Sequence, residues 1–287
     1  MQDRSSNLPF AIGIPALLWQ ILFFYVPLLL MVGTTLVTFA EDGSFTGLTL
    51  QNIGRFVTPV YGRVILSSIL LGLSNTTLCL LIGYPLAYFL AFTGKRFKNF
   101  FLFLLIVPFW TNFLLHVYAW FFVLERNGVV NTALIHLGLI ETPIHFLNSI
   151  FAIMVMMVYY YLPFMVLPIY SSLERFDKRL IEASLDLGAT SLETFRKIVL
   201  PLTRRGIVGG FFLVYIPSFA EFAIPELMGG DKLMFVGNAI SHYVLGEGTG
   251  SLGASFTVIS CAILLLTSGF LYWLLEKLLT PKQRCDA

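Results

Sequence analysis

Long apolar stretches separated by short polar segments dominate this sequence of 287 residues. A helix needs about 20 mostly apolar residues to cross the hydrocarbon core of a membrane. By this measure the sequence predicts six transmembrane helices, with soft edges, at residues 12–39, 64–93, 99–124, 149–173, 204–224 and 253–276. The first stretch is far longer than the roughly 7–15 apolar residues of a signal-peptide core, so we interpret it as a span.

The composition agrees with an integral membrane protein of the all-α class. Hydrophobic residues make up 57% of the chain and charged residues 12%, and ordinary soluble domains carry about twice that charged share. Proline occurs in five of the six stretches, at Pro27, Pro85, Pro108, Pro163, Pro168 and Pro217. Each proline removes a backbone donor, which neighbouring helices or a cavity can absorb. This pattern fits a bundle that must flex around a pathway.

The basic residues predict the orientation of the chain, because cytoplasmic loops carry the excess of Lys and Arg. With the N-terminus in the cytoplasm, only Arg55, Arg63, Arg126 and Lys232 of the 18 basic residues fall outside. We therefore expect a six-span transmembrane domain at 12–276, with cytoplasmic tails at 1–11 and 277–287.

Metal and nucleic-acid chemistry are not indicated. Cys79, Cys261 and Cys285 show no CxxC spacing, and the four histidines form no HxxxH or HExxH pair. No basic tract suits nucleic acid. We expect no metal site, no catalytic residue and no nucleic-acid partner.

The most polar continuous stretch lies between the fourth and fifth spans, at residues 177–201. Asp177 is a candidate N-cap for a short helix, and Gly188 suits the left-handed position after the end of that helix. Thr190-Ser-Leu-Glu193 has the form of a capping box and begins a second helix. The sequence therefore predicts two short cytoplasmic helices joined at a glycine. We call residues 177–201 the elbow.

An apolar face is predicted along the second helix, at the 3.6-residue period of Leu192, Phe195, Val199 and Leu202. Pro201 can open the following span, because a first-turn proline loses no hydrogen bond. A helix resting on the lipid surface would explain the apolar face. It would not explain the spacing of the acid, the glycine and the Leu-Pro pair.

This spacing resembles the EAA motif of ABC-importer permease subunits, which is Glu-Ala-Ala, three residues, Gly, nine residues and Ile-x-Leu-Pro. Here the motif reads Glu182-Ala183-Ser184, Gly188 and Ile198-Val199-Leu200-Pro201. Ser184 replaces the second alanine, and its small size predicts that close packing survives. In that family the elbow docks on a cytoplasmic ATPase. The resemblance thus implies a coupling role for Glu182, Ala183, Gly188, Ile198, Leu200 and Pro201.

Four further segments resemble the polyamine (spermidine/putrescine) branch of these permeases, within a similarity from about residue 10 to 276. They are LLIGYPLAYFLA (80–91), LLIVPFWTNFLLHVYAW (104–120), YLPFMVLPIYSSLERFD (161–177) and IPELMGG (224–230). The resemblance implies the type I ABC importer permease fold in the bacterial inner membrane, moving polyamines by alternating access. It also implies three partners, which are an ATPase dimer, a second homologous permease and an extracytoplasmic polyamine-binding protein.

The energy source is expected to lie outside this chain. The sequence contains no GxxxxGK[ST] motif, whose backbone cradles the phosphates of a nucleotide. We therefore expect a transport subunit that is not an enzyme and binds no cofactor, with ATP-Mg held by the partner ATPases.

Glu221 is a candidate substrate contact, because an ionisable group at membrane depth predicts a functional role. It lies near the outer end of the fifth stretch. Polyamines carry ammonium groups joined by methylenes, which suit carboxylates and aromatic faces. Alternatively, Glu221 pairs with a basic residue of the second permease or reaches the membrane interface. The other candidates for the pathway are Trp110, Tyr118, Tyr160, Tyr215, Glu226 and Asp231.

Three alternatives stay open. The same kind of permease could carry an anion, a sugar or a metal chelate, although no basic residue lies clearly at membrane depth. A stand-alone secondary transporter would work without an ATPase and would show repeated spans, and the sequence shows no convincing repeat. A membrane enzyme would need a nucleophile or metal constellation, and none assembles.

Overall fold

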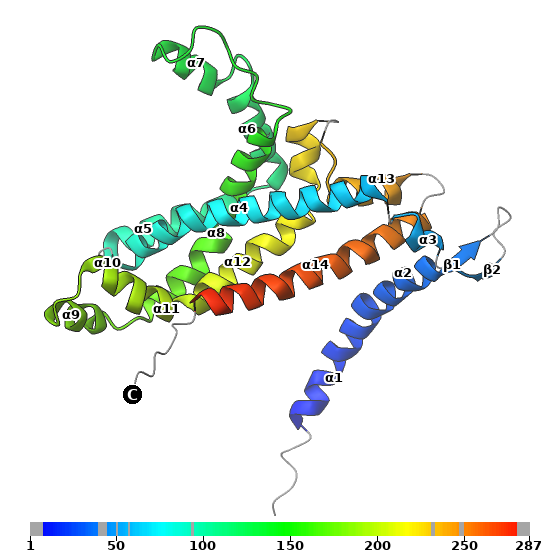
Figure 1. Ribbon diagram of the computed structural model, residues 1–287, viewed down its shortest axis with the longest axis horizontal. Helices are drawn as coiled ribbons and strands as arrows, with labels where there is room; N and C mark the ends of the chain where they lie inside the picture. Colours follow the sequence, from blue (N-terminus) through cyan, green and yellow to red (C-terminus); the bar gives the residue numbers. More distant parts are fainter. Residues whose placement is uncertain are drawn as a thin grey trace, which may run out of the picture. The chain divides into compact units, whose positions relative to one another are not determined.

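The computed structural model describes residues 8–39, 45–49, 51–56, 58–92, 95–230, 233–246 and 250–279. Apart from one two-stranded hairpin, the elements in these ranges are helical (Figure 1). Asp231 and most of the two predicted tails lie outside them. Contacts divide the chain into two compact units, one of residues 1–62 and 239–263 and the other of residues 63–238 and 264–287.

The first unit begins with a long apolar helix. It consists of α1 (Leu8–Gln20), a π-helical turn (Ile21–Tyr25) and α2 (Val26–Leu36). The span Gly13–Leu36 is long and apolar enough to cross a membrane, and its most apolar window buries nothing inside the structure. An apolar helix with no protein cover requires lipid or a partner around it.

A short polar cap follows this helix. β1 (Val37–Phe39) pairs antiparallel with β2 (Phe45–Leu48), and α3 (Gln51–Gly54) comes next. The buried Asn52 side chain donates to the carbonyl oxygens of Thr35 (3.3 Å) and Val37 (3.4 Å). This amide therefore satisfies backbone acceptors left free where α2 ends.

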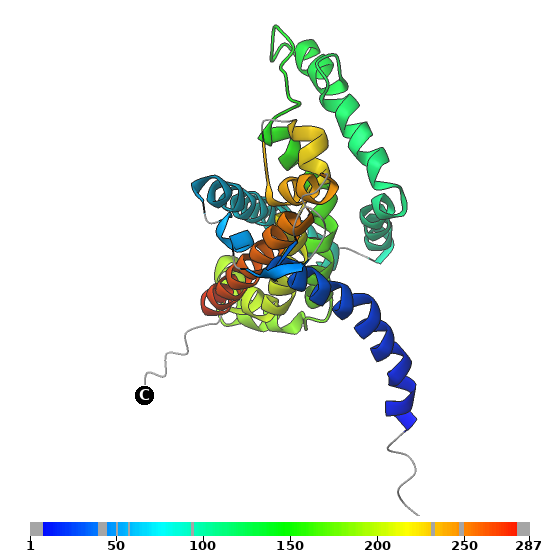
Figure 2. The same ribbon diagram turned by 90° about the vertical axis from the view of Figure 1, so that its right-hand side faces the viewer.

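Three helices that lie side by side form the core of the second unit (Figures 1 and 2): most of α4 (Pro59–Phe92), α8 (Ile150–Glu174) and α12 (Arg204–Phe219). Their buried faces form one hydrophobic cluster. Inside it, the buried Asn75 amide of α4 donates to Ser218 Oγ of α12 at 2.8 Å. Buried polar groups need such partners, so this bond stabilises the pairing of the two helices.

Glycines bring α8 and α12 into close contact. A Cβ atom on Gly206 would lie 2.5 Å from Ser172 Oγ and 2.6 Å from the Pro168 carbonyl oxygen. A Cβ atom on Gly210 would lie 3.0 Å from the Met165 carbonyl oxygen. Small residues four positions apart allow membrane helices to approach this closely, and the two glycines therefore set the distance between α8 and α12.

The third predicted span, 99–124, is wrong as a single helix. The stretch is divided into α5 (Lys95–Ile106), a 3₁₀ turn (Val107–Trp110) and α6 (Phe113–Leu124). Pro108 lies in the turn, where it removes a backbone donor. Asn112 then caps α6 by accepting from the Leu114 N–H at 2.8 Å. A proline followed by an N-cap ends one helix and begins another.

The His116 side chain of α6 forms hydrogen bonds to this break and to α8. Its Nε2 lies 2.9 Å from the Pro108 carbonyl oxygen, which accepts its hydrogen, and its Nδ1 lies 3.0 Å from the Tyr159 hydroxyl of α8. The side chain thus adds a donor to a carbonyl that also accepts from Thr111, and it attaches α6 to the core. Beyond α6, the short α7 (Val129–His136) projects away from α4, α8 and α12 (Figures 1 and 2).

The fifth predicted span, 204–224, also differs from the helix in the structure, which is shorter and follows a bend. α12 ends at Phe219, and the helical run Ser191–Leu202 meets it at an angle of 66°. The expectation that Pro201 opens the span is wrong, since Pro201 lies before the bend, in α11 (Leu200–Leu202). At the bend, the Thr203 hydroxyl donates to the Val199 carbonyl at 2.9 Å. Such a side-chain bond to the preceding turn is a known cause of helix bending.

The chain continues through a π-helical turn (Pro225–Gly229), α13 (Val236–Leu245) and α14 (Gly250–Leu279). Within the described ranges, four helices are long and apolar enough to cross a membrane, or five if the bent pair counts as one span. The all-helical membrane architecture therefore stands, whereas six spans and their direction stay predictions.

Replacing Gly206 with alanine is expected to push α8 and α12 apart, because the added methyl group meets a backbone carbonyl. Overpacking of this kind costs about 1–3 kcal/mol. We expect a clear fall in the thermal unfolding midpoint of the purified protein in detergent. Gly209→Ala is the control, because a Cβ there has its nearest neighbour 4.0 Å away. Equal midpoints for the two variants would contradict the close contact.

Candidate functional site

The elbow begins with a capped short helix, α9 (Arg179–Asp186). The Asp177 carboxylate accepts from the Arg179 N–H at 3.0 Å, as a cap does, although the residue directly before α9 is Lys178, whose side chain makes no cap bond. Gly188 follows α9 with φ +82°, in the left-handed region predicted for it. The Gly188 N–H donates to the Leu185 carbonyl (2.9 Å) and the Ala189 N–H to the Ser184 carbonyl (3.1 Å). These are the two bonds of a Schellman motif.

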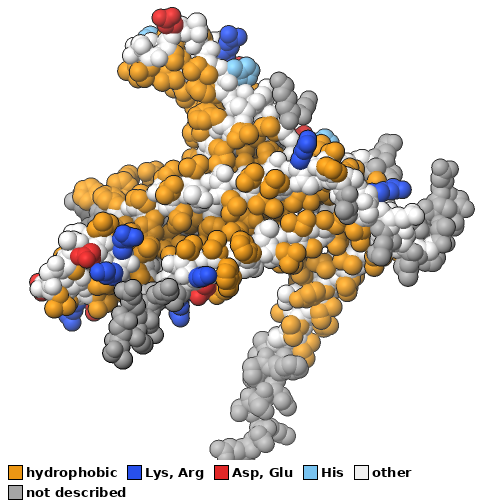
Figure 3. Space-filling model, viewed as in Figure 1, with side chains coloured by type: hydrophobic (Ala, Val, Ile, Leu, Met, Phe, Trp, Pro, Cys, Tyr) orange, Lys and Arg blue, Asp and Glu red, His pale blue; other side chains and the backbone are white. Residues whose placement is uncertain are grey.

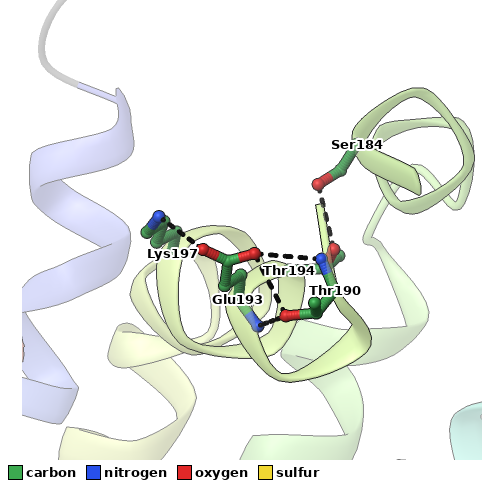
Figure 4. Close-up of polar contacts among 5 residues, drawn as sticks. All are labelled: Ser184, Thr190, Glu193, Thr194 and Lys197. Carbon is green, nitrogen blue, oxygen red and sulfur yellow. Dashed lines mark hydrogen bonds and ion pairs between the residues drawn. The ribbon is translucent and has the colours of Figure 1, made fainter. Parts of the chain in front are cut away.

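The predicted capping box is also confirmed, at the start of α10 (Ser191–Thr194) (Figure 4). The Glu193 N–H donates to Thr190 Oγ1 at 3.3 Å, and Glu193 Oε2 accepts from the Thr190 N–H at 3.0 Å. Lys197 Nζ lies 3.2 Å from Glu193 Oε1. The Thr190 backbone donor, followed by the Lys197 ammonium, lowers the pKa of Glu193. The carboxylate is therefore charged where the second helix needs an acceptor.

Ser184 ties the two helices of the elbow together. Its side chain is buried, and its Oγ lies 2.9 Å from Thr194 Oγ1, which is also buried (Figure 4). The prediction that serine preserves close packing at this motif position is confirmed. The bond also adds a polar link that alanine could not make, so the elbow is held at a fixed angle.

The apolar face predicted for the second helix is only partly correct. Val199 is buried and Phe195 half-buried, but the side chains of Leu192 and Leu202 are 65% and 55% exposed. A π-helical turn, Phe195–Val199, has more residues per turn than an α-helix. Leu202 follows this turn and therefore leaves the face shared by Phe195 and Val199, whereas Leu192 lies before it in α10.

The outer surface of the elbow combines charge with exposed leucines. Charged side chains gather around α9–α11 in Figure 3, whereas the visible surface of the long helices is mostly hydrophobic. The exposed leucines on α9 and just after it are Leu180, Leu185 and Leu187, the last 88% exposed. Of the motif residues, Glu182, Ala183 and Gly188 are exposed, and Ile198, Leu200 and Pro201 are half-buried. This surface suits a protein partner.

Glu221 lies two residues beyond the end of α12, where three donors hold its carboxylate. The hydroxyl of Tyr161 on α8 donates to Glu221 Oε2 at 2.6 Å. The N–H groups of Ala223 and Ile224 donate to Oε1 at 3.1 and 3.5 Å. The carboxylate therefore caps the helical segment that follows. A carboxylate has about four acceptor positions, so this arrangement leaves room for a further cation.

A groove of about 590 Å³ opens beside this carboxylate. Its acidic residues are Glu221 and Glu226, and the Asn238 amide donates to Glu226 Oε2. Aromatic side chains line it too, with the rings of Phe113 and Tyr160 5.0 Å apart, edge to face. The remaining lining residues are Leu114, Tyr161, Phe222, Ala223 and Leu227. No ion pair to either glutamate occurs within the described ranges.

The structure brings together only part of the predicted pathway. Tyr160 joins Glu221 and Glu226 at the groove. Trp110 and Tyr118 are 80% and 54% exposed and do not line it. Tyr215 is fully buried, with its hydroxyl donating to Thr267 Oγ1 at 3.1 Å. Asp231 lies outside the described residues. A role in transport stays a prediction for each of them.

Two residues that hold the glutamates of the groove were not predicted from the sequence. Tyr161 of α8 donates to Glu221 from 60 positions away, and Asn238 of α13 donates to Glu226 from 12 positions away. Three tyrosines stand in a row at 159–161. The four-residue spacing of Met157, Tyr161 and Met165, all buried, marks Tyr161 as the one on the inner face of α8. No local signal marks Asn238.

The sequence of this chain has many close relatives. It is 41% identical over 266 residues to the spermidine/putrescine transport system permease protein PotB of Escherichia coli K12, covering 92% of this chain and 96% of that protein. It is 36% identical to PotB of Haemophilus influenzae, covering 92% of each. The inner membrane ABC transporter permease protein YdcU of E. coli is 31% identical over 78% of this chain and 75% of its own length.

Solved structures show the same fold at low identity. A chain from the crystal structure of a bacterial ABC transporter that imports the acidic polysaccharide alginate has a TM-score of 0.70 and 16% identity, covering 94% of this chain and 95% of that one. Residues 83–284 match the family described as "Binding-protein-dependent transport system inner membrane component". As the elbow motif and the four further segments indicated, the chain therefore belongs to this family of inner-membrane transport components, in the branch that contains the PotB permeases.

Proposed function

We propose that this chain is the permease subunit of an ATP-driven importer and forms the path of a polyamine such as putrescine or spermidine. The observation that carries the proposal is the groove at Glu221 and Glu226, in a chain with close relatives that bear the name of spermidine/putrescine transport. Membership of the family supports the transport role, and the groove supports the cargo.

The groove has the chemistry that a polyamine requires. Each ammonium group prefers a carboxylate, and Glu221 and Glu226 provide two. The rings of Phe113, Tyr160 and Phe222 offer faces for cation–π attraction and apolar surface for the methylenes. The Tyr161 hydroxyl and the backbone donors fix Glu221 before any cargo arrives. Orienting an acceptor in advance reduces the entropy lost on binding.

A different cargo is the alternative. The alginate importers that share this fold carry an acidic polysaccharide, so the fold alone does not select a substrate. An anion requires Lys or Arg where it binds, and the lining residues of the groove include two glutamates and no basic residue. The charge of the groove therefore favours a cation over an anion.

The elbow is the proposed contact with the energy source. Two partner ATPases, carrying ATP-Mg, would hold its exposed leucines and move it during each cycle. The Schellman motif, the capping box and the Ser184–Thr194 bond support this role, because they make the elbow stiff enough to transmit a push to α12. A second homologous permease and an extracytoplasmic polyamine-binding protein complete the proposed importer. The proposed topology has six spans, with both termini in the cytoplasm.

Replacing Glu221 with glutamine tests the cargo site. Glutamine removes the charge and keeps one acceptor oxygen for the backbone donors, while its amide nitrogen can donate to the Tyr161 hydroxyl oxygen. Hydrogen bonds to charged groups contribute about 1.5–3 kcal/mol, so we expect uptake of labelled putrescine to fall about tenfold or more. Uptake is measured in cells that lack their own polyamine importers and express the complete transport system. Glu141→Gln, in the segment after α7, is the control. Unchanged uptake with Glu221→Gln would exclude this carboxylate from the path.

Substituting Gly188 tests the coupling role. Gly188→Val is expected to strain the left-handed residue by at least about 1–2 kcal/mol, deform the elbow and reduce ATP-driven uptake. Gly188→Asn is the matched control, because asparagine tolerates this conformation. No atom lies within 4 Å of the position of a Cβ at Gly188, so a difference between the two variants reports backbone conformation and not a clash. Normal ATPase co-purification and uptake with valine would disprove the coupling assignment.

A further inference from the structure

An aromatic groove of about 470 Å³ lies where the end of α4 meets the second helix of the elbow. Its walls are Tyr84, Pro85, Tyr88, Phe89 and Phe92 of α4, together with Phe195 of the elbow. The Phe195 ring meets the Tyr84 ring edge to face at 5.5 Å, and Tyr88 and Phe92 have ring centroids 4.4 Å apart. All but two of these residues come from the segment GYPLAYFLA, to which neither the cargo site nor the coupling motif gives a role.

The Lys178 cation stands beside this apolar groove. The Lys178 ammonium lies 4.9 Å from the centroid of the Phe92 ring, which is one of the walls. Within the described ranges, no carboxylate forms an ion pair with Lys178. The groove itself is lined by no acid, and its wall residue Phe89 is 52% exposed. The site thus combines an open apolar cleft with an unpaired positive charge near it.

An apolar groove with a nearby cation suits an anionic phospholipid and disfavours a polyamine. A polyamine would find no carboxylate in the groove and would be repelled by Lys178. An anionic phospholipid fits both features, because its acyl chain requires an apolar cleft and its phosphate requires a cation. Basic pockets between spanning helices on the cytoplasmic side are known to hold anionic head groups. A lysine with its stem along apolar surface also reaches the head-group level readily.

We infer that this groove binds an anionic phospholipid of the cytoplasmic leaflet, with an acyl chain against Tyr88, Phe89 and Phe92 and the phosphate at Lys178. The inference rests on the proposed function for one point, the cytoplasmic position of the elbow. The lipid would touch the last turns of α4 and Phe195 together. It would therefore fill the joint between the core and the elbow, and anionic lipid would support coupled transport.

The test uses the complete importer, with its partner subunits, purified in mild detergent and analysed by native mass spectrometry after incubation with phosphatidylglycerol. Lys178→Gln is expected to retain about fivefold less of this lipid, the effect of one basic residue at an anionic surface. Phe89→Ala keeps the charge and opens the apolar wall, and it is expected to lower retention as well. Lys197→Gln is the control, because it removes an equal charge from the elbow, but Lys197 pairs with Glu193, whereas Lys178 lies over a wall ring of the groove.

Each outcome decides the proposal. Loss of lipid with Lys178→Gln and Phe89→Ala, but not with Lys197→Gln, supports the site. Equal losses with Lys178→Gln and Lys197→Gln indicate general attraction to charge and overturn it. No retained phosphatidylglycerol in the unaltered importer also overturns it and leaves the groove to the ATPase. Polyamine uptake by the same preparation in liposomes of phosphatidylcholine and phosphatidylglycerol reports separately on the proposed function.

Discussion

The close approach of α8 and α12 is the constraint on which the rest of the second unit depends. Hydrophobic attraction does not hold helices together inside a bilayer, because lipid tails are as apolar as leucine. Contact must come from packing at short range, which Gly206 and Gly210 permit. α8 ends shortly before the elbow and α12 begins directly after it. Tyr161 of α8 and Glu221 beyond α12 meet near the other end of the pair. One helix pair therefore positions both candidate sites.

The elbow was predictable because its signals are local. A glycine after a helix, a Thr-x-x-Glu box and a small residue at position 184 each act within a few residues, and all three are present as expected. The exposure of Leu202 was not predictable, since no residue in the segment signals the π-helical turn that precedes it. A single extra residue per turn is enough to move a side chain from a buried face to an exposed one.

The groove at Glu221 and Glu226 could not be predicted in the same way, because its residues come from distant parts of the sequence. Glu221 stands out in the sequence as an acid among apolar neighbours, but its donor Tyr161 lies 60 positions away. Four aromatic residues were equal candidates by type, and only the packing of α6 against α8 places Tyr160 at the groove while Tyr215 is buried. Residue type predicts what a site needs. Which residues meet there is determined by the arrangement of helices, which apolar runs of similar length do not encode.

The break at Pro108 has a consequence for how the chain enters its membrane. α5 and α6 have 12 residues each, so each is about 18 Å long against a hydrocarbon core of about 30 Å. Neither half can be threaded across as an independent segment during synthesis. The Pro108 carbonyl accepts hydrogen bonds from Thr111 within the turn and from His116, which in turn is held by Tyr159, a residue translated later. The contact that attaches α6 to the core therefore forms only once α8 has been made.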